Sequence, residues 1–308
     1  MRSGEHSPPL SVTSHATNHQ PRVTAPMPGI LYLVATPIGN LEDITFRALR
    51  ILKEVDLVAA EDTRHSRKLF NHFDITTPLT SYFEHNEAQK GEHLLAQLKA
   101  GKSVALISDA GTPAISDPGF LLVRRCRDEG IAVLAVPGPS AAIAALAVSG
   151  LPTERFAFEG FLPARSKARR EALQMLRTEP RTTIFYEAPH RLLATLREIV
   201  LEMGAQREVA VARELTKLHE ELFRGTAAAA VDHFSAGRVR GEIVLLVAPA
   251  AAGAAEPAPG DTVEAALQAL RDEGLPLRQA VKQVAKKFGL PGDEVYRRAL
   301  AIKDQKKG

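Results

Sequence analysis

SDAGTPAISDPGF, residues 108–120, follows the apolar run Val104–Ile107 and precedes a segment with helical spacing of apolar residues. Its two glycines and two prolines impose an unusual backbone path, because glycine reaches positive φ while proline presets φ and removes a donor. Open α/β sheets bind ligands where such strand-to-helix turns leave the sheet. We therefore expect a ligand-binding turn, with Asp109 and Thr112 at its mouth.

Two other stretches repeat the plan of apolar strand, Gly/Pro turn and helix. They are LYLVATPIGNLEDIT, Leu31–Thr45, and VPGPSAAIAALAVSG, Val136–Gly150. Taken singly, each turn is equally well explained as an ordinary α/β loop punctuated by Gly and Pro. Three of them converging on one sheet edge predict a pocket.

Residues 29–150 alternate between strand and helix patterns, which favours a mainly parallel sheet covered by helices. The expected strands are residues 30–34, 57–60, 103–107 and 132–136, and the expected helices are residues 46–53, 87–100 and 121–129. Ser140 is expected to cap the helix that follows the last of these strands.

A second α/β unit is expected over residues 151–248. Its strands are residues 156–162, 182–186, 208–213 and 242–247, and its helices are residues 192–203 and 226–234. Short elements and a hairpin-like connection at 237–241 favour a more antiparallel sheet. Residues 249–260, PAAAGAAEPAPG, form an expected linker. Residues 261–308 then give a compact helix-turn-helix, for which nucleic-acid binding and a dimerisation or capping role both remain open.

Composition limits the class of protein. The chain has 308 residues, is 45% hydrophobic and contains no apolar run near the ~20 residues of a membrane span. Its single cysteine, Cys126, permits no intramolecular disulfide and suits a reducing cytoplasm, where a buried, inert thiol is expected. No cluster has convincing metal-ligand spacing, so no bound metal is expected. Residues 1–28, rich in Ser, Thr, His and Pro, are expected to be a disordered tail.

Basic residues gather in groups although the net charge is only +3. The groups are Arg64, Arg67 and Lys68; Arg165, Lys167, Arg169 and Arg170; and the residues from Arg278 onward. Such groups suit a polyanion such as RNA, although each one alone is commonly a solvated helix face.

Six long motifs occur in one order: ATPIGNLEDIT from Ala35, AEDTRHSRKLF from Ala60, the 108–120 stretch, VPGPSA from Val136, FYEAPHRL from Phe185 and ARELTK from Ala212. With these motifs the chain resembles, from about Gly29 to Ile302, the bacterial ribosomal small-subunit methyltransferase I family of the tetrapyrrole methylase superfamily. The resemblance implies methylation of the ribose 2′-hydroxyl of a cytidine in the decoding region of 16S rRNA, with S-adenosylmethionine as donor. It also implies an α/β, class III methyltransferase fold of two lobes with the donor between them, and a homodimer. Free 16S rRNA and the 30S subunit both remain open as substrate.

The resemblance further implies a set of donor-binding residues: Pro37, Ile38, Asp109, Ala110, Gly111, Thr112, Ser140, Ala141, Ala212 and Gly241. Small residues let the backbone approach a ligand closely, and Asp109 can accept hydrogen bonds, although it can equally stabilise the turn. The first turn has Thr36 and Pro37 where the superfamily is richer in glycine, a departure that argues against a tetrapyrrole enzyme.

For proton removal, Glu187 is the leading expected base, followed by Glu214, because both follow strands expected to face the cleft; His190 could serve instead. Each could also be an ordinary ion-pair or capping residue. The expected phosphate-binding residues are Arg64, His65, Arg67, Lys68, Arg191, Arg213 and Lys217. Tyr82, Phe83 and Tyr186 are the few surfaces on which a base could stack, with core packing as the alternative.

Three other functions compete with this one. A tetrapyrrole C-methyltransferase fits poorly with a basic helix-turn-helix. A non-catalytic RNA-binding factor would keep the donor pocket without turnover. A dinucleotide dehydrogenase is disfavoured because no G-x-G-x-x-G opens the first helix.

Overall fold

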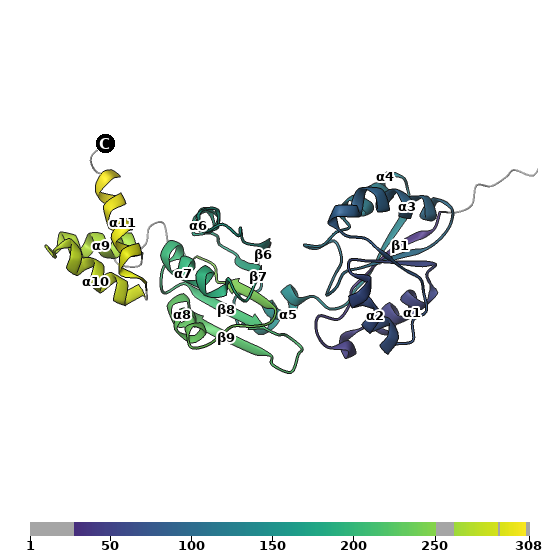
Figure 1. Ribbon diagram of the computed structural model, residues 1–308, viewed down its shortest axis with the longest axis horizontal. Coiled ribbons are helices and arrows are strands. Elements are labelled where there is room, and N and C mark those ends of the chain that lie inside the picture. The colour runs from purple at the N-terminus through teal and green to yellow at the C-terminus, as the bar shows by residue number, and fades with distance from the viewer. Residues whose placement is uncertain (1–27, 251–261, 289, 306–308) are drawn as a thin grey trace, which may run out of the picture.

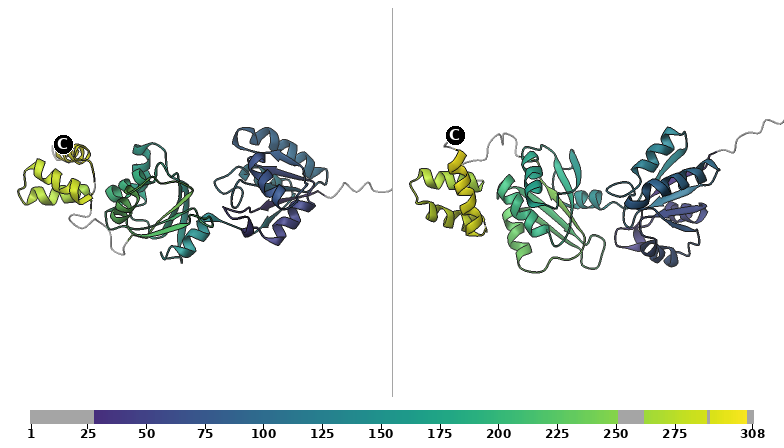
Figure 2. Two further views of the ribbon diagram at one scale, coloured as in Figure 1. Left: turned by 60° about the horizontal axis from the view of Figure 1, so that its bottom comes forward. Right: turned by 45° about the horizontal axis from the view of Figure 1, so that its top comes forward.

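The computed structural model describes residues 28–250, 262–288 and 290–305, so most of the expected tail (1–28) and linker (249–260) lies outside the described residues. Two α/β lobes and a helical module lie in a row, with the second lobe in the middle, and the views in Figures 1 and 2 agree on this order. The fold is the expected two-lobed α/β class with a C-terminal helical module.

The first lobe contains a five-stranded sheet in the order β3-β2-β4-β1-β5, with every pair parallel. Its strands are β1 Ile30–Val34, β2 Leu57–Ala60, β3 Leu79–Ser81, β4 Val104–Ile107 and β5 Ala132–Val136. Its helices are α1 Phe46–Glu54, α2 Thr63–His72, α3 Glu87–Lys99 and α4 Phe120–Asp128, with short 3-10 turns at Leu41–Asp43 and Glu84–Asn86. Helices α1 and α2 cover one face and α3 and α4 the other, which confirms the expected parallel sheet (Figure 1).

Two elements of this lobe were not expected from the sequence. Helix α2 buries only Ser66, Leu69 and Phe70, and it starts where the Asp62 side chain accepts a hydrogen bond from the Arg64 amide. Strand β3 has only three residues and pairs with β2 at the sheet edge. An apolar pattern carried by so few residues is too weak to predict either element.

The second sheet has the order β6-β7-β10-β8-β9. Its strands are β6 Phe156–Phe161, β7 Thr182–Glu187, β8 Glu208–Arg213, β9 Glu221–Thr226 and β10 Ile243–Val247. Only β6 and β7 are parallel, so the antiparallel expectation is confirmed. The expected hairpin at residues 237–241 was wrong, because these residues connect helix α8, Ala227–Ser235, to β10. The hairpin instead joins β8 to β9, a strand that the sequence did not predict.

Helix α5, Ala141–Val148, follows strand β5 of the first lobe and packs on the second sheet. Its buried Ala142, Ala145 and Leu146 share a core cluster with Ile184 and Val244. Ser140 is its N-cap residue, as expected, although the Ser140 side chain makes no capping hydrogen bond. The opposite face of this sheet is covered by α6 Ser166–Met175, α7 Leu192–Met203 and α8.

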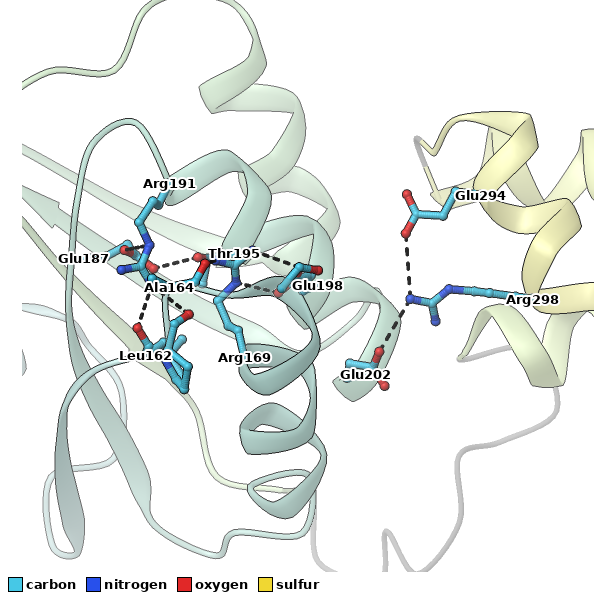
Figure 3. Close-up of polar contacts among 12 residues, drawn as sticks. Leu162, Ala164, Arg169, Glu187, Arg191, Thr195, Glu198, Glu202, Glu294 and Arg298 are labelled. Carbon is cyan, nitrogen blue, oxygen red and sulfur yellow. Dashed lines mark hydrogen bonds and ion pairs between the residues drawn. The ribbon is translucent and has the colours of Figure 1, made fainter. Parts of the chain in front are cut away.

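The C-terminal module consists of α9 Val263–Asp272, α10 Leu277–Phe288 and α11 Gly292–Gln305. Its apolar side chains belong to the same core cluster as α7 and α8. Arg298 of α11 pairs with Glu202 of α7 at 3.5 Å, which ties the module to the second lobe (Figure 3). Among the described helices, none has the length and apolar character needed to cross a membrane.

Candidate active site

A cavity of 790 Å³ opens where the turns after β1, β4 and β5 meet the second sheet. This volume lies within the ~300–1,000 Å³ typical of small-molecule sites. Nine of the ten residues expected to bind a methyl donor line it: Ile38, Asp109, Ala110, Gly111, Thr112, Ser140, Ala141, Ala212 and Gly241. The tenth, Pro37, is next to Ile38 in the chain but does not line the cavity. The three turns and the second lobe thus meet around one space.

Thr36 fixes the relative position of two of these turns. Its backbone exchanges two hydrogen bonds with Gly111, at 2.9 and 3.0 Å, and its buried hydroxyl donates to the Ser108 carbonyl at 3.1 Å. Gly111 has φ +80°, a conformation in which a side chain would be strained. The departure from glycine at residue 36 therefore has a structural use, since the hydroxyl ties the first turn to the second.

The long turn after β4 ends at a second tight position. Gly119 has φ +139°, and a Cβ there would lie 2.7 Å from Leu106 Cδ2. Its amide donates to Glu87 Oε1 at 3.1 Å, and that oxygen also accepts from the Tyr82 hydroxyl at 3.0 Å. Tyr82 is thus a core residue, and of the three expected stacking residues only Tyr186 lines the cavity.

Three carboxylates line the first-lobe side of the cavity: Glu61, Asp109 and Asp117. Asp109 Oδ1 accepts a hydrogen bond from the Asp62 amide at 3.1 Å. Burial, followed by repulsion from Glu61, raises the pKa of Asp117 to about 6, and burial together with repulsion from Asp109 raises the pKa of Glu61. Perturbed carboxyl groups in a cleft are typical of sites that move protons or bind cations.

Glu61 and Asp117 were not named from the sequence, although both stand in motifs quoted above. Glu61 follows β2 and Asp109 follows β4, and the pairing of these two strands brings the carboxylates together. Asp117 comes after Ala114 and Ser116, whose φ values of +65° and +63° turn the chain back toward the cavity. Strand order and positive φ at residues other than glycine are not visible in a single sequence.

The second-lobe wall of the cavity is aromatic. The Tyr186 ring makes edge contacts with Phe158 and Phe161, at centroid distances of 4.9 and 5.6 Å, and Phe156 also lines the space. Burial, followed by the charge of Asp117, raises the pKa of the Tyr186 hydroxyl. Asp117 of the first lobe and Tyr186 of the second therefore interact electrostatically across the cavity. This wall offers flat apolar surfaces on which a planar ligand can pack.

Glu187 lines the cavity, but its carboxylate is fully engaged elsewhere. Its Oε2 accepts from the Thr195 hydroxyl at 2.6 Å, and its Oε1 accepts from the Ala188 amide at 2.8 Å (Figure 3). Arg191 Nε lies 3.2 Å from Oε1, and the Glu187 side chain is 0% exposed. The carboxylate therefore holds the end of β7 on the start of α7.

Glu214 and His190, the other expected bases, lie outside the residues that line the cavity. Glu214 has φ +53°, and its Oε1 accepts from Lys217 Nζ at 2.7 Å and from the Glu242 amide at 2.9 Å. These bonds, led by the one from Lys217, lower the pKa of Glu214. His190 is exposed in the loop before α7. The structure therefore gives Glu214 a loop-fixing position beside the cavity.

The expected phosphate-binding residues fall into two groups. His65, Arg67 and Lys68 project from α2, exposed and without a carboxylate partner among the described residues, while Arg64 pairs with Asp62 at 2.9 Å. The others are engaged: Arg213 with Glu221 at 2.7 Å, Lys217 with Glu214 and Glu242, and Arg191 with Glu187 and the Leu162 carbonyl. Arg169, from the second basic group, is buried against Glu198.

Comparison with known proteins agrees with this architecture. Residues 30–231 match the family of Tetrapyrrole (Corrin/Porphyrin) Methylases, and residues 256–303 match the RsmI C-terminal HTH domain. The chain is 49% identical over 274 residues to Ribosomal RNA small subunit methyltransferase I of Synechocystis, which covers 89% of this chain and 98% of that protein. It is 50% identical over 275 residues to the protein of that name from Pseudomonas aeruginosa, covering 88% and 97% of the two chains.

Solved structures show the same fold at lower identity. A cobalt precorrin-4 methyltransferase matches with a TM-score of 0.55 at 19% identity, over 71% of this chain and 94% of that one. A uroporphyrin-III C-methyltransferase from Thermus thermophilus, complexed with S-adenosyl homocysteine, matches with a TM-score of 0.50 at 21% identity, over 71% and 97%. The fold has two lobes around a central cavity and a helix-turn-helix module, and the sequence is about 50% identical to these relatives over nearly its full length. The chain therefore belongs to the ribosomal RNA small subunit methyltransferase I family.

Proposed function

We propose that this protein transfers a methyl group from S-adenosylmethionine to the ribose 2′-oxygen of cytidine 1402 of 16S rRNA. One observation carries the proposal. The 790 Å³ cavity is built from the motif residues of a chain that is about half identical, over nearly its full length, to ribosomal RNA methyltransferases.

The residues around the cavity fit such a donor. Gly111 and Gly241, at φ +80° and +88°, present backbone without side chains, and Ala141 and Ala212 keep the facing wall shallow. The carboxylates of Asp109 and Glu61 supply negative charge for a ligand that carries an amino group and a positive sulfur. We assign the donor to these residues and its flat purine to the apolar part of the wall.

Asp117 is the best-placed proton acceptor in this cavity. The bound donor supplies an electrophilic methyl group, so the protein has to align the ribose oxygen and accept its proton. Asp117 lines the cavity, is partly buried and has a pKa of about 6, which makes it a stronger base than an ordinary aspartate. Glu187 and Glu214 are less suited, because their oxygens already accept hydrogen bonds from Thr195 and Lys217.

RNA contacts are assigned to both lobes. The exposed basic side chains His65, Arg67 and Lys68 of α2 come four to seven residues after Glu61, so phosphates held there would lie near the cavity. Phosphate contacts position the strand without reading its sequence. Tyr186 and the phenylalanines beside it are assigned to the extruded base.

The setting of the reaction is part of the proposal. We place it in the cytoplasm, with the assembled 30S subunit as substrate and a homodimer as the working form. Four large apolar side chains that do not line the cavity are exposed between the start of α4 and the end of α5: Phe120, Leu121, Leu134 and Val148. Exposed apolar groups concentrated in this way favour a protein interface.

The competing activity is C-methylation of a tetrapyrrole, the chemistry named for two of the structural neighbours. Incubating the protein with labelled S-adenosylmethionine and either unmodified 30S subunits or uroporphyrinogen III separates the two. Label in RNA and none in the tetrapyrrole supports the proposal. The reverse pattern overturns it.

A further inference from the structure

A second cavity, of 690 Å³, lies where the C-terminal module meets the second lobe. We call it the junction cleft. Its lining comes from α6, Lys167, Arg170, Glu171 and Gln174; from Arg177, two residues beyond the end of α6; from α7, Leu201 and Glu202; and from the module, Thr262, Glu264 and Arg298. It is separate from the first cavity, with which it shares no lining residue.

Arg298 closes the module side of the junction cleft. Its guanidinium lies 3.5 Å from Glu202 and 3.8 Å from Glu294 (Figure 3). It also lies 2.9 Å from Glu264, and its side chain is only 13% exposed. Glu202 also accepts from the Gln174 amide at 2.7 Å. Arg298 therefore bridges carboxylates of α7, α9 and α11 and positions the module on α7.

Two other arginines of the cleft have no carboxylate partner among the described residues. Neither Arg170 nor Arg177 pairs with a carboxylate anywhere in the described ranges, and Arg177 Nη2 is buried without a hydrogen-bond partner. Arg207 donates to the backbone carbonyl of Arg177 at 2.5 Å, and, after burial itself, the positive charge of Arg177 is the next cause that lowers the pKa of Arg207. A buried charged donor without an acceptor destabilises the folded state by its full desolvation free energy.

Lys167 is a third cation, at the rim of the cleft. Its ammonium lies 3.9 Å from Glu171, and its side chain is 87% exposed. Four cations, Lys167, Arg170, Arg177 and Arg298, and three carboxylates line the cleft, so its lining keeps one net positive charge. Guanidinium groups bind phosphate oxygens with paired hydrogen bonds, so the missing partner has the chemistry of a phosphate.

We propose that the junction cleft binds a backbone phosphate of the RNA substrate, held by Arg170 and Arg177 with Lys167 at the rim. The inference rests on the proposed function, because RNA supplies the phosphodiester. The second lobe lies between this cleft and the first lobe, so the contact is remote from the reacting ribose (Figures 1 and 2). It would anchor a neighbouring strand and favour a folded, multi-strand substrate over a short oligonucleotide.

The test compares the double variant R170Q/R177Q with R47Q/R50Q, which removes the same charge from exposed positions on α1 of the first lobe. For the full-length protein, R170Q/R177Q should raise KM for 30S subunits about tenfold. It should also reduce the slope of log affinity against log salt by about 1 to 2, as expected for one or two lost phosphate contacts. The control should change KM less than twofold and leave the slope unchanged. Donor affinity, measured by calorimetry in both variants, should match the wild type and so show that the fold is intact.

Binding of 30S subunits measured without turnover keeps this inference separate from the proposed function, since the cleft can be tested even if the methylated atom is different. Equal 30S affinity in the two double variants overturns the proposal. A second arm uses inorganic phosphate as the probe. If phosphate raises the melting temperature of the wild type but not of R170Q/R177Q, while 30S affinity stays equal, the cleft binds a free anion and the assignment to RNA is wrong.

Discussion

At the scale of single residues, the carboxylates around the first cavity divide into those that build the site and those left for its chemistry. Glu187 and Glu214 each accept two or more hydrogen bonds from their own lobe. Asp117 stands against the cavity with its pKa raised to about 6. Their difference in environment sets different expectations for substitution.

Asp117→Asn should slow methyl transfer roughly 100-fold, the lower end of general-base effects. It should also stabilise the protein at pH 7. Because the folded state raises the pKa of Asp117 above 3.8, wild-type stability falls as pH rises from about 4 through about 6. The variant avoids that loss, by on the order of 1 kcal/mol once partial exposure is allowed for.

Rates and melting temperatures between pH 4 and pH 8 check both parts, with Asp128→Asn, an exposed carboxylate on α4, as control. The gain in stability should vanish near pH 4, where both proteins are neutral at this position. Normal turnover of Asp117→Asn would remove Asp117 as the base.

Glu187→Gln should act mainly on stability. Removing the charge of Glu187, whose side chain is 0% exposed, leaves the largely buried Arg191 with less compensation, so we expect a loss of about 2–4 kcal/mol in the free energy of unfolding. Denaturant unfolding measures it, and Glu54→Gln, from an exposed pair with Arg50, should change stability by less than about 0.5 kcal/mol. Unchanged stability with slowed transfer would instead return Glu187 to the role of base.

At the scale of elements, the active cavity depends on turns whose backbone paths are tightly constrained. Gly241, in the loop before β10, has φ +88°, and a Cβ there would lie 2.3 Å from Glu214 Cδ. Glu214 cannot move freely, because it is bonded to Lys217 and to the Glu242 amide. The loop therefore requires glycine at this position.

Gly241→Ala should weaken donor binding at least tenfold and cost about 1–3 kcal/mol of stability. Gly237→Ala, in the same connection but with open space around its Cβ, should be close to neutral. Calorimetric titration of both variants with S-adenosylmethionine makes the comparison. Equal affinities would mean that the loop can shift and that Gly241 does not shape the cavity.

The same scale shows what the sequence could predict. Strands β1, β2 and β4 of the first lobe are short apolar runs, and they were found where expected. Helix α2 and strand β3 were missed because they bury few apolar residues. Glu61 was missed because its place beside Asp109 follows from the pairing of β2 with β4, which is a property of strand order and not of local pattern.

At the scale of the whole molecule, the proposed homodimer predicts that exposed apolar side chains of β5 and α5 are buried between two copies of the chain. Leu134 lies on the edge strand β5 and is 41% exposed, and Val148 at the end of α5 is 52% exposed. A charge at either position would be buried at an interface formed by these elements, and burying an unpaired charge costs several kcal/mol.

Leu134→Glu and Val148→Glu should therefore halve the mass seen by size-exclusion chromatography with light scattering. Met175→Glu, at a 79% exposed position on α6, should leave the mass unchanged. A wild-type protein that is already monomeric would contradict the homodimer.

The most direct test of the whole account identifies the methylated atom. Unmodified 30S subunits are incubated with the protein and S-adenosylmethionine, and the modified position in the RNA is mapped. The RNA is then digested to nucleosides, and the methylated nucleoside is identified by chromatography and mass spectrometry. The account predicts a single new 2′-O-methylcytidine at position 1402 of 16S rRNA. A methyl group on a base, on another nucleotide or on no RNA at all would contradict it.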